Sequence, residues 1–110
     1  MKFKKKVINV LGTKWTIYRE EFTSDKLDGY TDYTVREIHI RSNNLNDVSD
    51  FDALMKKQLR HEVIHAFMAE SGLQSNWEHY NTYGHEETVV DWIAIQFSKI
   101  LKVYEELECL

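Results

Sequence analysis

Two histidines and a glutamate in one short run have the clearest chemical potential in this sequence. The segment from Arg60 to His65 reads R-H-E-V-I-H and so contains the pattern H-E-x-x-H. On a helix, residues four apart lie on the same face, so His61 and His65 can both reach one tetrahedral Zn²⁺ at about 2.0–2.1 Å. Glu62 lies at the edge of that face, where it can take a proton from a zinc-bound water as the water attacks a carbonyl. The pattern therefore predicts a zinc site equipped for hydrolysis.

A catalytic zinc needs a third protein ligand, and the candidates lie in the downstream segment G-H-E-E-T-V-V-D-W. His85, Glu86 and Glu87 are all open as this ligand. Glu87 is favoured because it precedes Asp91 by one helical turn. Asp91 stands in an apolar run, where a carboxylate needs a partner, and the ring N–H of a ligand histidine would be one. The helix macrodipole alone explains acidic residues in a first turn, but it does not explain Asp91.

A helix is expected to contain the H-E-x-x-H run. Apolar residues recur at helical spacing through this region, namely Phe51, Met55, Leu59, Val63 and Phe67. Ser49 is the expected N-cap, in a capping box with Asp52. Gly72 is a natural end because glycine tolerates the left-handed conformation that follows many helices. These signals predict a helix from about 50 to 71, with both histidines in its middle.

The candidate third ligand lies at the start of another expected helix, from about 85 to 107. Its main apolar stripe consists of Val89, Ile93, Phe97, Ile100, Tyr104 and Leu107. Further apolar residues widen this stripe, so we expect the helix to be buried on more than one side. Residues 73–84 show no periodicity and are expected to form a loop.

The first forty residues show the alternation typical of β-strands. Strands are expected at about 7–11 and 14–18, with a turn between them, and two more lie between 30 and 41, the second over 37–41. Strands therefore come first and helices second in a chain of 110 residues. We expect one α+β domain over 1–110, with a small antiparallel or mixed sheet packed on two main helices.

Composition excludes several classes of function. The net charge is −4, and the one basic run, Lys4–Lys6, is too short for a nucleic-acid interface. No segment has the length of a membrane span, and the N-terminus lacks the pattern of a signal peptide, so we expect a cytoplasmic protein with no membrane partner. Cys109 is the one cysteine, which excludes an internal disulfide and makes it an improbable metal ligand.

The spacing of the site residues resembles the gluzincin family of thermolysin-type zinc metallopeptidases. In that family H-E-x-x-H is followed by a helix containing N-E-x-x-x-D. This chain has Glu87-x-x-x-Asp91 at the corresponding place, with Glu86 where the family pattern has asparagine. The resemblance covers mainly residues 59–72 and 84–100.

The short chain and the run L-R-H-E-V-I-H-A-F, which begins at Leu59, are also similar to small metallopeptidase-like proteins encoded by phages and prophages. These proteins are related in style to the ImmA/IrrE group. The strand half of the chain matches them only in kind. This likeness implies a protein that works inside a bacterial cell or the host cell of a phage.

The resemblance implies a minimal zincin-like fold and a set of roles. His61, His65 and Glu87 would be the zinc ligands, and Glu62 would be the general base. Asp91 would accept a hydrogen bond from a ligand histidine, His61 by preference. The implied reaction is hydrolysis of a peptide bond, in a peptide or protein substrate, by a zinc-activated water.

Two further expectations concern the surroundings of the zinc. By the same resemblance, the strand that contains Ile38 and Ile40 would be the sheet edge beside the metal, where an extended peptide could add as a strand. His39 would then point to solvent or toward the cleft. A zinc hydrolase also needs a donor for the oxyanion. The candidates for this donor are His79, Tyr80, Tyr83 and His85.

Two other functions compete with the peptidase. In the first, zinc stabilises a small core and the protein is a binding or regulatory module without catalysis. A purely structural site has no need of a base such as Glu62. In the second, His61 and His65 are ordinary surface histidines of a metal-free helical interaction protein.

Overall fold

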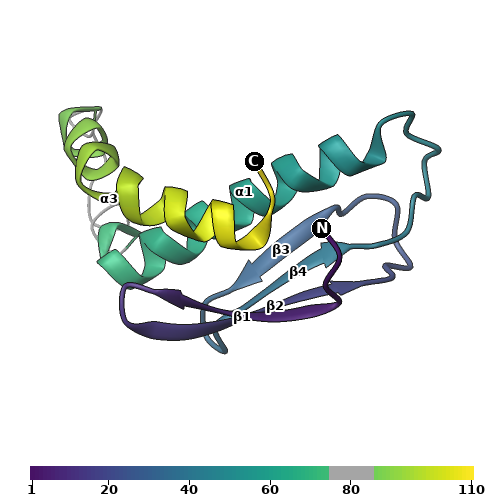
Figure 1. Cartoon of the computed structure of the whole chain (residues 1–110), viewed down its shortest axis with the longest axis horizontal. Helices are drawn as coiled ribbons and strands as arrows, with labels where there is room; N and C mark the ends of the chain where they lie inside the picture. The colour runs from purple at the N-terminus through teal and green to yellow at the C-terminus, as the bar shows by residue number, and fades with distance from the viewer. Residues whose placement is uncertain (75–85) are drawn as a thin grey trace.

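The structure is a computed structural model that describes residues 1–74 and 86–110. Within the second range, side-chain positions are described except at Glu86, Glu87, Thr88, Val90, Asp91 and Ala94. The architecture has two layers, with both helices on one face of a four-stranded sheet (Figure 1). The expected α+β class, with a mixed sheet and two main helices, is confirmed. No helix among the described residues is long and apolar enough to cross a bilayer.

The sheet has the strand order β1-β2-β4-β3. β1 (Lys5–Val10) and β2 (Thr13–Glu20) form an antiparallel hairpin around a two-residue turn in which both residues have positive φ. β3 (Gly29–Asp32) and β4 (Glu37–Arg41) form a second hairpin. β4 joins the two hairpins because it lies parallel to β2. The sheet is therefore mixed, and β1 and β3 are its edges.

The first helix, α1 (Phe51–Ser71), has the predicted extent. Its N-cap is Asp50, whose carboxylate accepts a hydrogen bond from the backbone N–H of Ala53 at 3.1 Å. The prediction of Ser49 as the cap is therefore wrong by one residue, since aspartate caps a helix as well as serine does. Asp52 does not reach back to the cap; its carboxylate lies 3.2 Å from the Lys56 ammonium. Gly72 follows the helix with φ 83°, as predicted.

The second helix, α3 (Glu86–Leu107), matches the expected range of 85–107. The loop expected over 73–84 is wrong at its first two residues, because Leu73 and Gln74 are helical. The rest of that loop lies outside the described residues.

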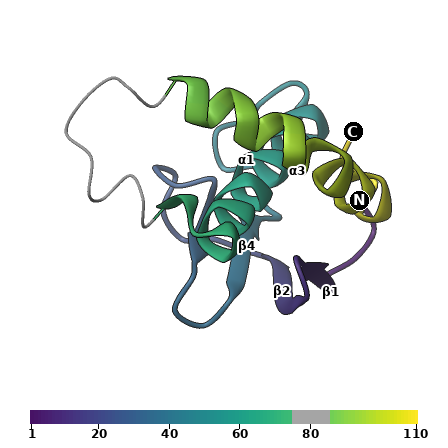
Figure 2. The ribbon, with the colours of Figure 1, turned by 90° about the vertical axis from the view of Figure 1, so that its left-hand side faces the viewer.

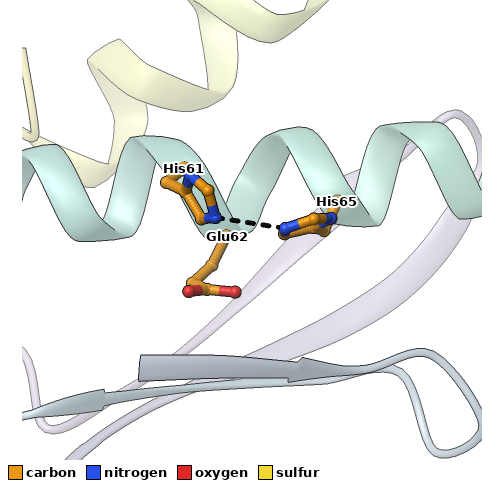
Figure 3. A group of neighbouring side chains, drawn as sticks. All are labelled: His61, Glu62 and His65. Atoms are coloured by element: carbon orange, nitrogen blue, oxygen red, sulfur yellow. Dashed lines mark hydrogen bonds between the residues drawn. The ribbon is translucent and has the colours of Figure 1, made fainter. Parts of the chain in front are cut away.

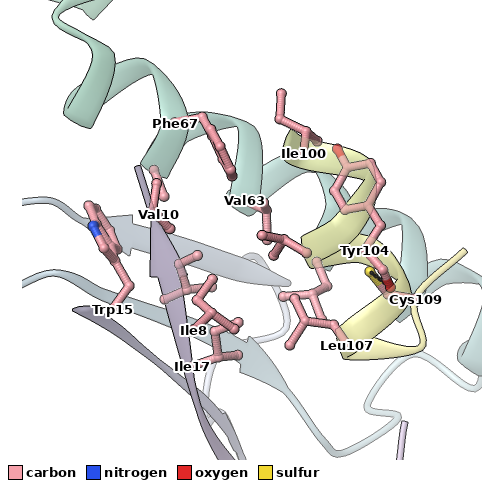
Figure 4. Packing of buried hydrophobic residues seen from close by; sticks show 14 of the residues in the cluster. Ile8, Val10, Trp15, Ile17, Val63, Phe67, Ile100, Tyr104, Leu107 and Cys109 are labelled. Carbon is pink, nitrogen blue, oxygen red and sulfur yellow. Dashed lines mark hydrogen bonds between the residues drawn. The ribbon is translucent and has the colours of Figure 1, made fainter. Parts of the chain in front are cut away.

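The core lies between the sheet and the helices (Figure 4). Alternate residues of three strands face the helices and are fully buried: Ile8, Val10, Trp15, Ile17, Ile38 and Ile40. From α1 the predicted stripe meets them, with Met55, Leu59, Val63 and Phe67 all buried. Period-two strands and a period-3.6 helix thus place their apolar faces together as expected.

The burial predicted for α3 holds only for its second half. Ile100, Tyr104 and Leu107 are buried, whereas Ile93 is 50% exposed and Phe97 is 56% exposed. The expectation that the whole stripe is buried is therefore wrong. The half of α3 nearer Glu86 extends past the end of the sheet, so no strand lies beneath it (Figure 1).

The chain end fixes α3 to the middle of α1. The Arg60 guanidinium donates to the carbonyl of Cys109 at 2.7 Å, and the Tyr104 hydroxyl donates to the carbonyl of Arg60 at 3.1 Å. Burial raises the pKa of Tyr104 to about 12, so this phenol stays a donor. Cys109 is fully buried in the core, in agreement with a packing role. These contacts hold the backbone next to His61.

The cap assignment gives a first prediction. Asp50→Ala should lower the free energy of unfolding by about 1 kcal/mol, because an orphan N–H of the first turn loses its acceptor. Ser49→Ala is the matched control and should change stability by only a few tenths of that amount. Urea unfolding followed by circular dichroism measures both. Equal losses in the two variants would contradict the assignment of Asp50 as the cap.

Candidate metal centre

His61 and His65 lie one turn apart on α1 with exposed rings that converge (Figure 3). Their Nε2 atoms are 3.2 Å apart, and the two ring planes are nearly perpendicular, at 76°. Two nitrogens bound to one tetrahedral zinc at about 2.0–2.1 Å would be about 3.3 Å apart. The pair therefore already has the spacing of two ligands to one metal ion.

The packing of α1 explains why these histidines face outward. Val63, Ala66 and Phe67 are buried against the sheet and α3. Helical periodicity then turns His61 and His65 toward the rim of the helix. The core thus fixes the rotation of α1, and the rotation presents the two imidazoles together.

Glu62 lies between this rim and the sheet and is only 4% exposed. Its Oε1 accepts a hydrogen bond from the Thr31 hydroxyl at 2.8 Å, and its Oε2 accepts one from the Gln58 amide at 2.5 Å. Each carboxylate oxygen thus has its own donor, as a buried ionised carboxylate requires. One potential metal-ligand atom from each of His61, Glu62 and His65 lies within 4.8 Å of the other two.

A close approach of α1 to the edge strand makes this arrangement possible. Gly29, at the start of β3, is buried, and a Cβ built on it would lie 3.0 Å from the His39 carbonyl oxygen and 3.1 Å from Cγ of Gln58. A larger residue would push Gln58 away from β3. The absence of a side chain at Gly29 thus leaves room for the Gln58 amide beside Glu62.

The described residues around the histidines form a pocket of about 610 Å³. It is lined by Gly29, Tyr30, Thr31, Tyr33, Gln58, His61, Glu62, His65, Met68 and Gln74. The sequence reasoning missed Thr31, Gln58 and Tyr33. Helical spacing could have found Gln58, four residues before Glu62, but no local signal indicates Thr31 or Tyr33.

The other predicted site residues fall outside what the structure describes. Glu87 and Asp91 are one turn apart in the first half of α3, as expected, but the structure does not describe their side chains or that of Glu86. The four candidates for the oxyanion donor, which include His85, lie outside the described residues.

The prediction that the strand with Ile38 and Ile40 forms the sheet edge beside the metal is wrong. β4, which contains Ile38 and Ile40, lies between β2 and β3, so β3 is the edge. The reason is the parallel pairing of β4 with β2, which covers one side of β4, while the β3–β4 hairpin covers the other. α1 lies beside β3, which supplies Thr31 to Glu62.

His39 points neither to the histidine pair nor freely into solvent. It lies on the sheet face away from the helices, stacked between Tyr18 and Tyr30 at centroid distances of 4.9 and 4.7 Å. Its Nε2 is 2.9 Å from a Glu37 carboxylate oxygen, and its Nδ1 contacts the Glu20 carboxylate. His39 therefore joins three strands of the outer face and is separate from the candidate site.

Comparisons of the chain with family models, curated proteins and solved structures find no match in any of the three. The likeness to gluzincins consequently rests on the motif residues. The potential ligand atoms themselves fit a metal ion. Two converging imidazoles beside a carboxylate suit zinc, which is intermediate between hard and soft cations and binds nitrogen and oxygen ligands.

The histidine geometry predicts about one zinc ion per chain. His61→Ala and His65→Ala should each abolish stoichiometric zinc, because each removes one of the two nitrogen ligands and leaves an incomplete site. His39→Ala is the control, because this histidine is stacked between two tyrosines on the other face of the sheet and should not contribute to zinc binding. Elemental analysis after dialysis gives the zinc content. Retention of a full equivalent by both site variants would refute the ligand assignment.

The third ligand can be identified by a matched pair on α3. Glu87→Gln should reduce zinc affinity strongly, whereas Glu86→Gln should leave it close to that of the parent. Asp91→Ala should still fold and bind zinc about 10–100-fold more weakly, the usual effect of losing a partner of a ligand histidine. Competition with a chromophoric chelator measures all three affinities. The reverse order of Glu86 and Glu87 would make Glu86 the ligand.

Proposed function

We propose that this chain is a small zinc-dependent metallopeptidase of zincin-like type, with His61, His65 and Glu87 as ligands and Glu62 as general base. The observation that carries the proposal is the buried Glu62 carboxylate, whose oxygen lies within 4.8 Å of the histidine nitrogens. A structural metal site needs no such carboxylate next to it. The mixed sheet under the motif helix is compatible with a minimal zincin-like arrangement.

The residues divide the work of hydrolysis. A zinc ion bound there would lower the pKa of a coordinated water to near 7 and polarise a substrate carbonyl. Glu62 is held as an acceptor by Thr31 and Gln58, so it can take a proton from water and pass it to the leaving amine. Burial excludes bulk water from this carboxylate and strengthens its interactions.

The substrate would be an extended segment of a peptide or protein. β3 is a sheet edge next to the pocket, and an unpaired edge can accept an added strand through backbone hydrogen bonds. Tyr33 and Met68 line the pocket and would contact substrate side chains. We place this activity inside a bacterial cell or the host cell of a phage, in line with the motif likeness.

The alternative is a zinc-stabilised module that binds a partner without catalysis. The exposed apolar half of α3, with Ile93 and Phe97, is the observation that favours it, because such surfaces are typical of protein contacts. The two proposals differ in what Glu62 does.

Glu62→Gln separates the two functions. The variant should keep the metal, because the ligands are unchanged and the volume is nearly the same. Cleavage of a peptide substrate found by library screening should fall by about 10²–10⁴-fold, the contribution of a positioned acid/base group. Glu105→Gln, at an exposed position in the second half of α3, is the control and should retain cleavage. Full activity of Glu62→Gln would argue for the non-catalytic module.

A further inference from the structure

We infer that Thr31 and Gln58 are positioning residues that hold Glu62 out of the metal shell and thereby keep one coordination position open. This inference rests on the proposed zinc site and concerns what the chain does to its own glutamate. It predicts that removing the two donors converts an open site into a closed one.

Glu62 is close enough to become a ligand. Its carboxylate lies within 4.8 Å of the ligand nitrogens of both His61 and His65, on the same helix. Carboxylate oxygens are ordinary zinc ligands at about 2.0–2.2 Å, and small side-chain rotations move an oxygen by more than an ångström. An unrestrained Glu62 would therefore join His61, His65 and Glu87, and four protein ligands close a zinc site.

The restraint comes from one donor on each oxygen. The Thr31 hydroxyl donates to Oε1 at 2.8 Å, and the Gln58 amide donates to Oε2 at 2.5 Å. Figure 3 shows the result: the two imidazoles face each other along the helix, and the Glu62 carboxylate lies below them, toward the strands. To bind the metal, the Glu62 carboxylate would have to move toward the histidine nitrogens, away from the place where Thr31 and Gln58 hold its two oxygens.

The two donors lie on regular secondary structure, Thr31 on β3 and Gln58 on α1. Thr31 pairs with Ile38 in the β3–β4 ladder, and its hydroxyl also lies 3.2 Å from the Glu62 carbonyl oxygen. Gln58 lies one turn before Glu62 on α1 and packs on Gly29 of β3. The sheet edge and the helix thus position the carboxylate from two sides. We therefore expect it to stay in this position, outside the coordination shell, when a metal ion binds to the histidines.

The test uses substitutions that preserve shape and remove the donors. Thr31→Val and Gln58→Met are combined in one double variant of the full chain. Cobalt(II) is the probe, because its visible absorption reports the ligands, and zinc affinity is measured by chelator competition. In the double variant we expect a changed cobalt spectrum and zinc binding about 10-fold tighter, because a fourth protein ligand is gained. The rise in melting temperature on adding zinc should also be larger.

Three controls assign the effect to Glu62. Thr31→Ser retains the hydroxyl and should match the parent. Thr34→Val removes a hydroxyl from the same hairpin that bonds only Asp32, and it should also match the parent. Adding Glu62→Gln to the double variant removes the new ligand, so the spectral change and the gain in affinity should both disappear.

Each outcome has a definite meaning. A folded double variant with the parent's cobalt spectrum, and with unchanged or weaker zinc binding, overturns this inference and leaves the proposed function intact. A parent chain that binds neither zinc nor cobalt overturns both. If the double variant does not fold, the single variants decide, because each should show the spectral change in part, and parent-like spectra in both refute the inference.

Discussion

The hydrogen bond between the buried residue Glu62 and Thr31 on the sheet edge is the constraint on which the rest of the site depends. A carboxylate that is 4% exposed is stable only if its oxygens have donors, so α1 must lie where Glu62 meets the sheet edge. The next residue, Val63, is buried in the core. Rotating α1 would therefore unpair Glu62 and expose Val63 together. Given this one orientation, His61 and His65 must lie on the outer rim, where their nitrogens converge.

Contacts on either side of the motif keep that orientation. Before it, Arg60 binds the carbonyl of Cys109 at the end of the chain. After it, the Glu70 carboxylate accepts a hydrogen bond from the Trp15 indole at 2.8 Å and lies 3.4 Å from the Arg36 guanidinium. The helix is thus tied to the segment after α3, to β2 and to the turn between β3 and β4. Support of this kind would hold the side chains of the candidate site in place before any ligand binds.

Local periodicity predicts local structure here and stops where long-range contacts decide. The extent of α1 and the buried stripe from Met55 to Phe67 follow from helical spacing, and the H-E-x-x-H histidines converge because of the same spacing. The order of the strands in the sheet cannot be predicted in this way. It depends on the parallel pairing of β4 with β2, which joins two hairpins and has no signal in the local sequence of either hairpin. Phe97 shows a similar limit: a stripe tells which residues share a face, but not how far the opposing layer extends. Thr31 was missed because its partner is 31 residues away in the chain.

The residues around Glu62 also indicate whether packing alone would require a carboxylate at this position. An apolar residue of similar volume would fill this place without donors, and replacing buried polar groups by apolar ones is often neutral or stabilising. The chain instead has a threonine on the edge strand, a glutamine one turn earlier, and a glycine that lets the glutamine approach. Packing alone requires none of these three. Their combination is explained if a carboxylate has to be held in a fixed position beside a pair of histidines spaced for one metal ion. Such a fixed carboxylate suits a base that acts on a metal-bound water, because the protein, and not a bond to the metal, has to hold a base beside the ion.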